Sequence, residues 1–180
     1  GKAAADIGVR DGRIDEIGIF PHAPAREIFE ARGLNVLPGV IDTHVHFREP
    51  GLTHKEDLES GSRGAVLGGV TAVFEMPNTD PTTTTAAALA DKVKRAHHRM
   101  HCDFAFYVGA TRENTHELGE LERLPGAAGV KVFMGSSTGS LLIEDDEGVR
   151  KVLQAIRRRA AFHCEDEYRL RERMNLRVEG

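Results

Sequence analysis

Residues 39–51 read GVIDTHVHFREPG, an apolar strand pattern that runs directly into a polar loop. Side chains two positions apart in a strand point to the same face, so His44 and His46 present two imidazoles together. Imidazole nitrogen is a common zinc ligand. The alternative for such a pair is two polar strand residues that face water, but the preceding apolar run favours a buried strand. We therefore predict that His44 and His46 bind a metal ion.

The same order of apolar strand, loop and amphipathic helix occurs five times from residue 36 onward. Repeated βα units indicate a parallel sheet, and a regular series of them indicates a (β/α) barrel of the TIM type. In such barrels the functional side chains follow the carboxyl ends of the strands. The predicted strands are residues 36–47, 71–76, 103–108, 129–134 and 160–164, and the predicted helices are residues 55–67, 86–101, 114–124, 144–159 and 165–174.

A complete barrel has eight such units in roughly 250 residues, whereas this chain of 180 residues provides five. We expect about three of the eight units to lie outside the sequence, which makes it a fragment or one part of a protein. An open half-barrel has two unpaired strand edges, and unpaired edges promote association. Oligomerisation or the remaining units would cover these edges, and we expect a homo-oligomer.

The chain begins with a different pattern. Residues 6–19 alternate apolar and polar side chains around Asp11-Gly12, which predicts two short strands joined by a tight turn. We therefore assign residues 1–35 to part of a small β-sandwich subdomain and residues 36–180 to the N-terminal portion of a metal-dependent (β/α) barrel.

Composition narrows the class of protein. The chain has 40% apolar and 29% charged residues, as globular proteins do, and its net charge of -4 disfavours nucleic acid as a partner. Cys102 and Cys164 form no CxxC motif, so neither a disulfide framework nor a thiolate zinc cage is indicated, and a cytoplasmic location fits. The apolar stretches are of strand length and the first residues lack a signal-peptide pattern, so we expect no membrane association.

Two further side chains are candidate metal ligands. Lys131 lies within GVKVFM, residues 129–134, and a buried lysine is costly unless it is neutral or paired. Reaction with carbon dioxide would give a carbamate, an anionic ligand able to bridge two zinc ions; the alternative is an edge lysine with its ammonium in solvent. His163 ends the apolar strand of residues 160–164 and is either a ligand of the same centre or a core histidine.

Four segments together resemble the amidohydrolase superfamily and, within it, the dihydroorotases. They are HVHFREPG at residues 44–51, THKED at 53–57, EMPNT at 75–79 and KVFMGSSTG at 131–139. The resemblance runs from residue 6 through residue 180. It implies a site with two zinc ions held by His44, His46, carbamylated Lys131 and His163.

The resemblance also implies that Arg48 and Asn78 bind the carboxylate of the substrate. A guanidinium can meet a carboxylate in two parallel hydrogen bonds, and an amide adds one donor. Hydantoinases, dihydropyrimidinases and allantoinases share the metal ligands, but their cyclic amides lack the ring carboxylate and the arginine is not part of their usual pattern. The alternatives are a surface salt bridge from Arg48 to Glu49 or Asp57, and a turn role for Asn78.

The implied reaction is the reversible, zinc-dependent hydrolysis of dihydroorotate, a small-molecule substrate, to N-carbamoyl-L-aspartate in pyrimidine biosynthesis. Some members associate with an aspartate transcarbamoylase. The family's acid/base aspartate and a further histidine ligand follow later strands, beyond residue 180, so we predict no catalytic residue within this chain. The other readings are a different cyclic amidase of the hydantoinase, dihydropyrimidinase or allantoinase type, and a catalytically inert barrel fragment.

The remaining polar residues have simpler predicted roles. Asp57 caps or braces the first loop, and residues 145–147 favour a helix N-terminus. Residues 135–139 contact substrate or only turn the chain. We expect five histidines that have no strand-end placement to lie on the surface: His54, His97, His98, His101 and His116.

Overall fold

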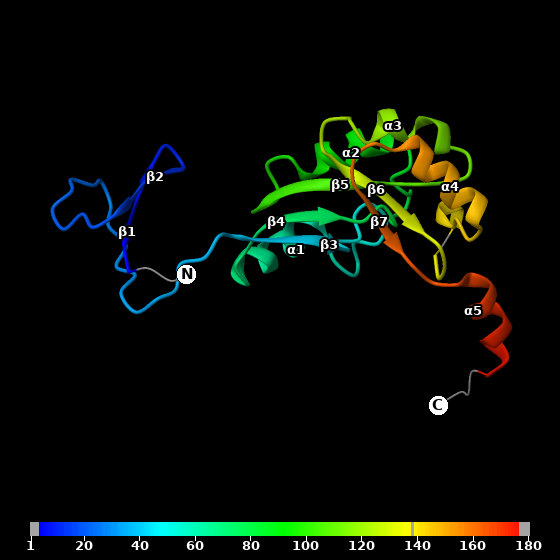
Figure 1. Cartoon of the computed structure of the whole chain (residues 1–180), viewed down its shortest axis with the longest axis horizontal. Coiled ribbons are helices and arrows are strands. Elements are labelled where there is room, and N and C mark those ends of the chain that lie inside the picture. The colour runs from blue at the N-terminus through cyan, green and yellow to red at the C-terminus, as the bar shows by residue number, and fades with distance from the viewer. Residues whose placement is uncertain (1–3, 138, 177–180) are drawn as a thin grey trace. The chain divides into compact units, whose positions relative to one another are not determined.

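The computed structural model describes residues 4–137 and 139–176 (Figure 1). The chain divides into two compact units, Gly1–Leu37 and Pro38–Gly180. In the first unit, β1 (Asp6–Arg10) and β2 (Arg13–Gly18) pair antiparallel. Asp11 and Gly12 join them with φ values of 50° and 73°, the left-handed backbone that a two-residue hairpin turn requires. The predicted hairpin is confirmed, and its place in a β-sandwich stays a prediction.

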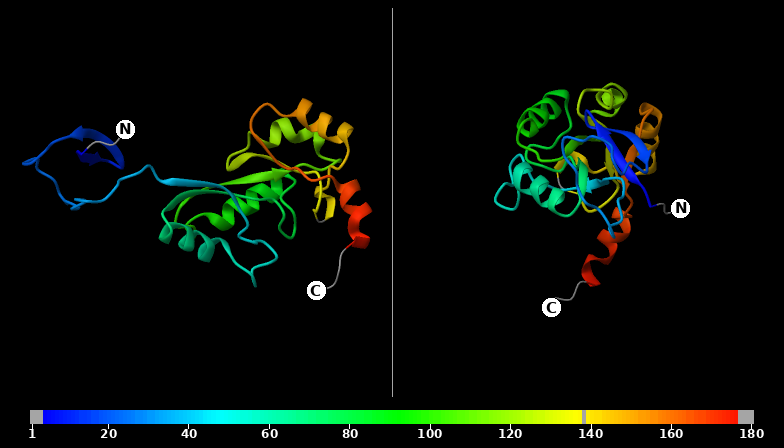
Figure 2. Two further views of the ribbon diagram at one scale, coloured as in Figure 1. Left: turned by 60° about the horizontal axis from the view of Figure 1, so that its bottom comes forward. Right: turned by 90° about the vertical axis from the view of Figure 1, so that its left-hand side faces the viewer.

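The second unit is built on one parallel sheet of five strands in the order β3-β4-β5-β6-β7. Each strand pairs with the next one along the chain, as in a (β/α) barrel. Figure 2 shows the sheet curled, with helices on its outer side. The predicted fold class, part of a TIM-like barrel, is confirmed. The strands are β3 (Val40–Val45), β4 (Val70–Glu75), β5 (Asp103–Gly109), β6 (Ala127–Phe133) and β7 (Ala160–His163).

The longer helices start where the sequence supplies a capping side chain. Asp57, Thr85, Asp145 and Asp166 each accept a hydrogen bond from the backbone amide three residues later. The predicted roles of Asp57 and Asp145 at helix starts are confirmed. The helical segments are α1 (Leu58–Leu67), α2 (Ala86–Ala96), η1 (Thr115–Glu117), α3 (Leu118–Leu121), η2 (Gly139–Leu141), α4 (Asp146–Ala155), α5 (Glu167–Arg173) and η3 (Met174–Leu176).

Several predicted boundaries are wrong. The helix predicted over residues 86–101 ends at Ala96, because His97 is extended and His98 has a φ of 60°. The helix predicted over residues 114–124 is a 3₁₀ turn followed by one short helical turn. The strand predicted over residues 36–47 is limited to β3, since Pro38 has no amide hydrogen to donate to a neighbouring strand.

The core lies between the sheet and the helices. Phe106, Val108, Val130 and Val132 of β5 and β6 are fully buried against helix residues such as Leu89. By contrast, Val40 and Ile41 of β3 are more than half exposed, and Val45 at the end of the strand is only partly buried, so the prediction of a buried strand there is wrong for the described chain. The reason is topological: β3 and β7 are the two edges of the sheet, and each lacks an outer neighbour among the described residues. No helix in this part of the chain is long and apolar enough to cross a membrane.

Candidate metal centre

The first two predicted ligands lie at the carboxyl end of β3. His44 is the penultimate residue of β3, and His46 is the first residue after the strand. Their ring centroids are 5.2 Å apart. His44 is exposed, whereas His46 is half-buried. The structure thus brings the two imidazoles together as the period of a strand requires.

Asn78 contacts the second of these imidazoles. It follows β4, and its Oδ1 lies 2.9 Å from His46 Nδ1. With Nδ1 as the donor, the lone pair of His46 Nε2 is left free for a metal ion. The amide nitrogen of Asn78 then remains as a donor toward a ligand. Asn78 therefore does more than turn the chain after Pro77.

Lys131 is buried in β6, with 1% of its surface exposed. Its Nζ lies 4.9 Å from the ring centroid of Phe133, and within residues 4–137 and 139–176 no carboxylate pairs with it. Burial lowers the pKa of the Lys131 amine. The alternative of an edge lysine with a solvated ammonium is therefore wrong.

His163 is the last residue of β7, and Phe133 is its partner in β6. Its Nε2 lies 2.9 Å from Glu165 Oε2, yet both atoms are shielded from water and the contact lacks hydrogen-bond geometry. A shielded imidazole nitrogen without a proper partner is an unsatisfied group that a metal ion would satisfy. Glu165 beside it was not predicted as a site residue.

The surroundings of the two imidazoles favour their neutral form. Burial lowers the pKa of His44, and the charge of Lys131 lowers it further, with a smaller contribution from His163. Burial, followed by the charges of Arg48 and His44, lowers the pKa of His46 to about 4. Both imidazoles are therefore neutral near pH 7, which is the form that binds metal.

The donor set fits a metal ion but is not a closed centre. In the described part of the chain, no three His, Cys, Asp or Glu side chains converge closely enough to hold an ion by themselves. The predicted set depends on Lys131, which becomes an anionic ligand only as a carbamate. The fit therefore rests on two neutral imidazoles, one unsatisfied imidazole nitrogen on His163 and a buried amine.

A buried ion pair that sequence reasoning missed supports this end of β4. Lys92 of α2 and Glu75 of β4 are 0% and 1% exposed and pair with each other, and Lys92 Nζ also donates to the Met76 carbonyl at 2.9 Å. Burial raises the pKa of Glu75 to about 7, with Lys92 opposing the shift. The pair fixes the backbone immediately before Asn78. The signal was present, since Lys92 occupies the apolar face of its helix with Leu89 and Ala96.

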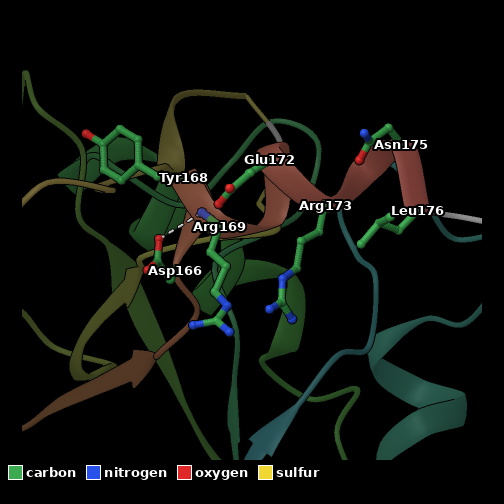
Figure 3. Close-up of a pocket in the computed structure, with 7 residues that line it drawn as sticks. All are labelled: Asp166, Tyr168, Arg169, Glu172, Arg173, Asn175 and Leu176. Carbon is green, nitrogen blue, oxygen red and sulfur yellow. Dashed lines mark hydrogen bonds between the residues drawn. The ribbon is translucent and has the colours of Figure 1, made fainter.

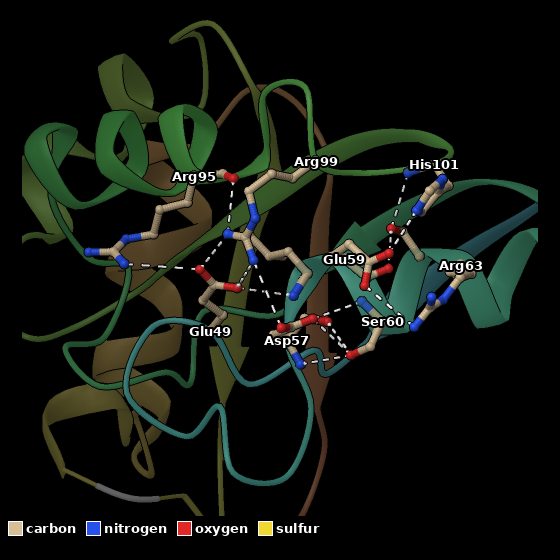
Figure 4. Close-up of polar contacts among 10 residues, drawn as sticks. Glu49, Asp57, Glu59, Ser60, Arg63, Arg95, Arg99 and His101 are labelled. Carbon is tan, nitrogen blue, oxygen red and sulfur yellow. Dashed lines mark hydrogen bonds and ion pairs between the residues drawn. The ribbon is translucent and has the colours of Figure 1, made fainter.

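Arg48 follows His46 by two residues and has a φ of 63°. Its predicted alternative, a salt bridge with Glu49 or Asp57, is absent from the described residues. Glu49 pairs instead with Arg99, which lies after α2 (Figure 4). The charge of Arg48 lowers the pKa of both His46 and Glu75.

Other features do not belong to this centre. The hollow in Figure 3 is formed by Asp166, which caps α5, and by side chains of α5 and η3, and none of the predicted ligands lines it. The five histidines expected on the surface are all exposed. Ser136 donates its backbone amide to Glu167 at 3.0 Å, which ties the loop after β6 to α5.

Comparison with known proteins agrees with this fold. The model of the amidohydrolase family matches residues 35–174, and the chain belongs to that family. It is 39% identical to a dihydroorotase of Methanosarcina acetivorans over 167 residues, which are 91% of this chain and 35% of the relative. It is 44% identical to an allantoinase of Rubrobacter xylanophilus over 143 residues, 78% of this chain and 31% of the relative.

The solved structure of an L-hydantoinase from Arthrobacter aurescens superposes with a TM-score of 0.89 at 32% identity. That likeness covers 96% of this chain and 39% of the hydantoinase. The chain spans about a third of the length of the curated relatives that it matches. All three names describe proteins that act on cyclic amides, but the three differ in substrate.

Proposed function

We propose that this chain supplies the metal-binding and carboxylate-binding part of a zinc-dependent cyclic amidohydrolase that opens dihydroorotate to N-carbamoyl-L-aspartate, reversibly. One observation carries the choice of substrate. Arg48 follows His46 by two residues in the loop after β3 and has no carboxylate partner among the described residues. The nearby carboxylate of Glu75 already pairs with Lys92. A guanidinium left free next to the candidate ligands suits a substrate that brings its own carboxylate.

His44, His46, Lys131 and His163 are the residues that would hold the zinc pair, with Lys131 as a bridging carbamate. Burial lowers the pKa of the Lys131 amine, and the neutral amine is the form that can react with carbon dioxide. When bound, zinc would lower the pKa of water and polarise an amide carbonyl. The acid/base aspartate and a further histidine ligand belong, in this proposal, to strands outside residues 1–180.

The chain's own residues orient the substrate. Arg48 receives the ring carboxylate, and the amide nitrogen of Asn78, left free by the contact of its oxygen with His46, donates a second hydrogen bond. Both residues lie in the loops that follow β3 and β4, so the bound ring amide would face the ligand histidines. Positioning of this kind contributes to catalysis without any proton transfer by the two residues.

A second substrate class has support of its own. The allantoinase of Rubrobacter xylanophilus is 44% identical to this chain and the L-hydantoinase superposes closely. If this chain shares its substrate class with those two proteins, the substrate is a cyclic amide without the ring carboxylate, and Arg48 has another role.

The test uses the intact protein that contains this chain, loaded with zinc. Turnover of dihydroorotate, hydantoin and allantoin is measured for the wild type and for Arg48→Met, with zinc content determined for both. We expect the wild type to open dihydroorotate, and the variant to keep its zinc but lose about 10- to 100-fold in kcat/KM, since a charged hydrogen-bonded pair contributes roughly 1.5–3 kcal/mol. Equal turnover by the variant, or wild-type turnover of only hydantoin or allantoin, would contradict the proposed substrate.

A further inference from the structure

Glu49, the residue after Arg48, is buried and bound at both carboxylate oxygens. It is 5% exposed. Arg99 donates from Nη1 to Oε1 at 2.7 Å and from Nη2 to Oε2 at 3.2 Å. The backbone amide of Leu58 also donates to Oε2, at 3.1 Å. Figure 4 shows this two-armed contact between Glu49 and Arg99.

These contacts join three parts of the chain that are distant in sequence. Glu49 belongs to the loop after β3, Leu58 is the first residue of α1, and Arg99 follows the end of α2. Arg99 is itself fixed, because its Nη1 also donates to the carbonyl of Arg95 at 3.2 Å and its Nη2 lies 3.9 Å from Asp57 Oδ2. The carboxylate of Glu49 raises the pKa of Arg99, so the guanidinium stays charged.

Backbone hydrogen bonds hold the loop at Arg48 and just after it. The carbonyl of Arg48 accepts a hydrogen bond from the Leu52 amide at 2.9 Å, and the Pro50 carbonyl accepts one from the Asp80 amide at 3.1 Å. Arg48 has a φ of 63°, a left-handed conformation that is unfavourable for a residue with a Cβ. Such a conformation persists only where the surroundings hold it. Both residues that adjoin Arg48 are buried, Phe47 in the core and Glu49 in its contacts with Arg99 and Leu58.

We propose that Glu49 and Arg99 are positioning residues for Arg48: their ion pair holds the loop after β3 in the backbone conformation that Arg48 adopts, and it thereby sets the affinity for the substrate carboxylate. The inference rests on the proposed function. Neither Glu49 nor Arg99 is among the candidate metal ligands, so they act on the substrate only through Arg48. No local sequence pattern predicts this pair, because 50 positions separate its members.

The test measures kcat and KM for dihydroorotate, together with zinc content, in the intact protein carrying Arg99→Met. The matched control is Arg95→Met, which removes the same kind of side chain at a contact of 4.0 Å to Glu49 Oε1. We expect Arg99→Met to raise KM about tenfold with kcat changed much less, and the control to leave KM within about twofold. A purely structural role would instead lower zinc content and kcat together.

A double variant decides whether Arg99 acts through Arg48. In the Arg48→Met background, Arg99→Met should change KM by less than about twofold, because the positioned group is already gone. A full additional tenfold rise, or an unchanged KM in the single variant, would overturn the inference. If Arg99→Met loses its zinc, Arg99→Lys is measured in its place. Lysine keeps the positive charge but cannot make both hydrogen bonds to Glu49, and the same changes in KM are expected.

The two proposals fail in different ways. Wild-type protein that does not open dihydroorotate contradicts the proposed function and this inference with it. Wild-type turnover that Arg48→Met lowers and Arg99→Met leaves unchanged contradicts the inference alone.

Discussion

Replacing Lys92 by Met would leave the Glu75 carboxylate buried without a partner. Both side chains have almost no contact with water, at 0% and 1% exposure, so no solvent can take the place of the lost ammonium. The hydrogen bond from Lys92 Nζ to the Met76 carbonyl is lost as well. Removing one member of a fully buried ion pair costs about 3–5 kcal/mol, and we expect Lys92→Met to lower the free energy of unfolding by that amount.

The stability lost in Lys92→Met should increase as pH rises. Burial raises the pKa of Glu75 in the folded protein to about 7, above the pKa of the same group in the unfolded chain. The stability that Glu75 contributes is therefore fully present below the unfolded pKa and is lost as pH rises through the folded pKa. Without Lys92 the folded pKa rises further, because the opposing charge is gone. Above pH 7 the free energy of unfolding of the variant therefore continues to fall, by about 1.4 kcal/mol per pH unit. The wild type does not lose stability in this range.

The assay is urea unfolding of the intact protein, followed by circular dichroism at about pH 6 and about pH 8.5, for both proteins. Lys92→Met combined with Glu75→Gln is the control, because it removes both charges and should recover about half of the loss or more. A loss below about 1 kcal/mol in the single variant, or a gap between variant and wild type that narrows as pH rises, would refute this account of the pair.

Two further predictions concern the metal centre. Lys131→Ala should remove most of the bound zinc, as measured by elemental analysis of the purified protein, since the proposed bridging ligand is lost; zinc content equal to that of the wild type would exclude the carbamate bridge. Asn78→Ala should weaken zinc binding about 10- to 100-fold in competition with a chelator, because His46 Nδ1 loses its partner at 2.9 Å. An unchanged zinc affinity in that variant would mean that Asn78 does not orient His46.

Local patterns in the sequence were sufficient for much of the fold. The βα repeat predicted five parallel strands in chain order, because each strand is a short apolar run with turn residues on both sides. The pairing of His44 with His46 follows from the two-residue period of a strand. Helix starts were also predictable at Asp57 and Asp145, since a capping side chain acts on its own helix.

The rest depended on contacts between distant residues. Glu75 with Lys92, and Glu49 with Arg99, are set by how α2 packs on the sheet, and no local pattern specifies those partners. The exposure of β3 follows from its position at a sheet edge, which depends on which strands surround it. Glu165 beside His163 was missed because its approach depends on the turn after β7.

The most direct test of the central claim is zinc-dependent ring opening by the intact protein, with dihydroorotate, hydantoin and allantoin compared at equal concentration. The account predicts that dihydroorotate is opened fastest, that chelation abolishes its turnover and that added zinc restores it. Turnover that survives complete removal of metal, or turnover of the two substrates without a ring carboxylate in preference to dihydroorotate, would contradict the account.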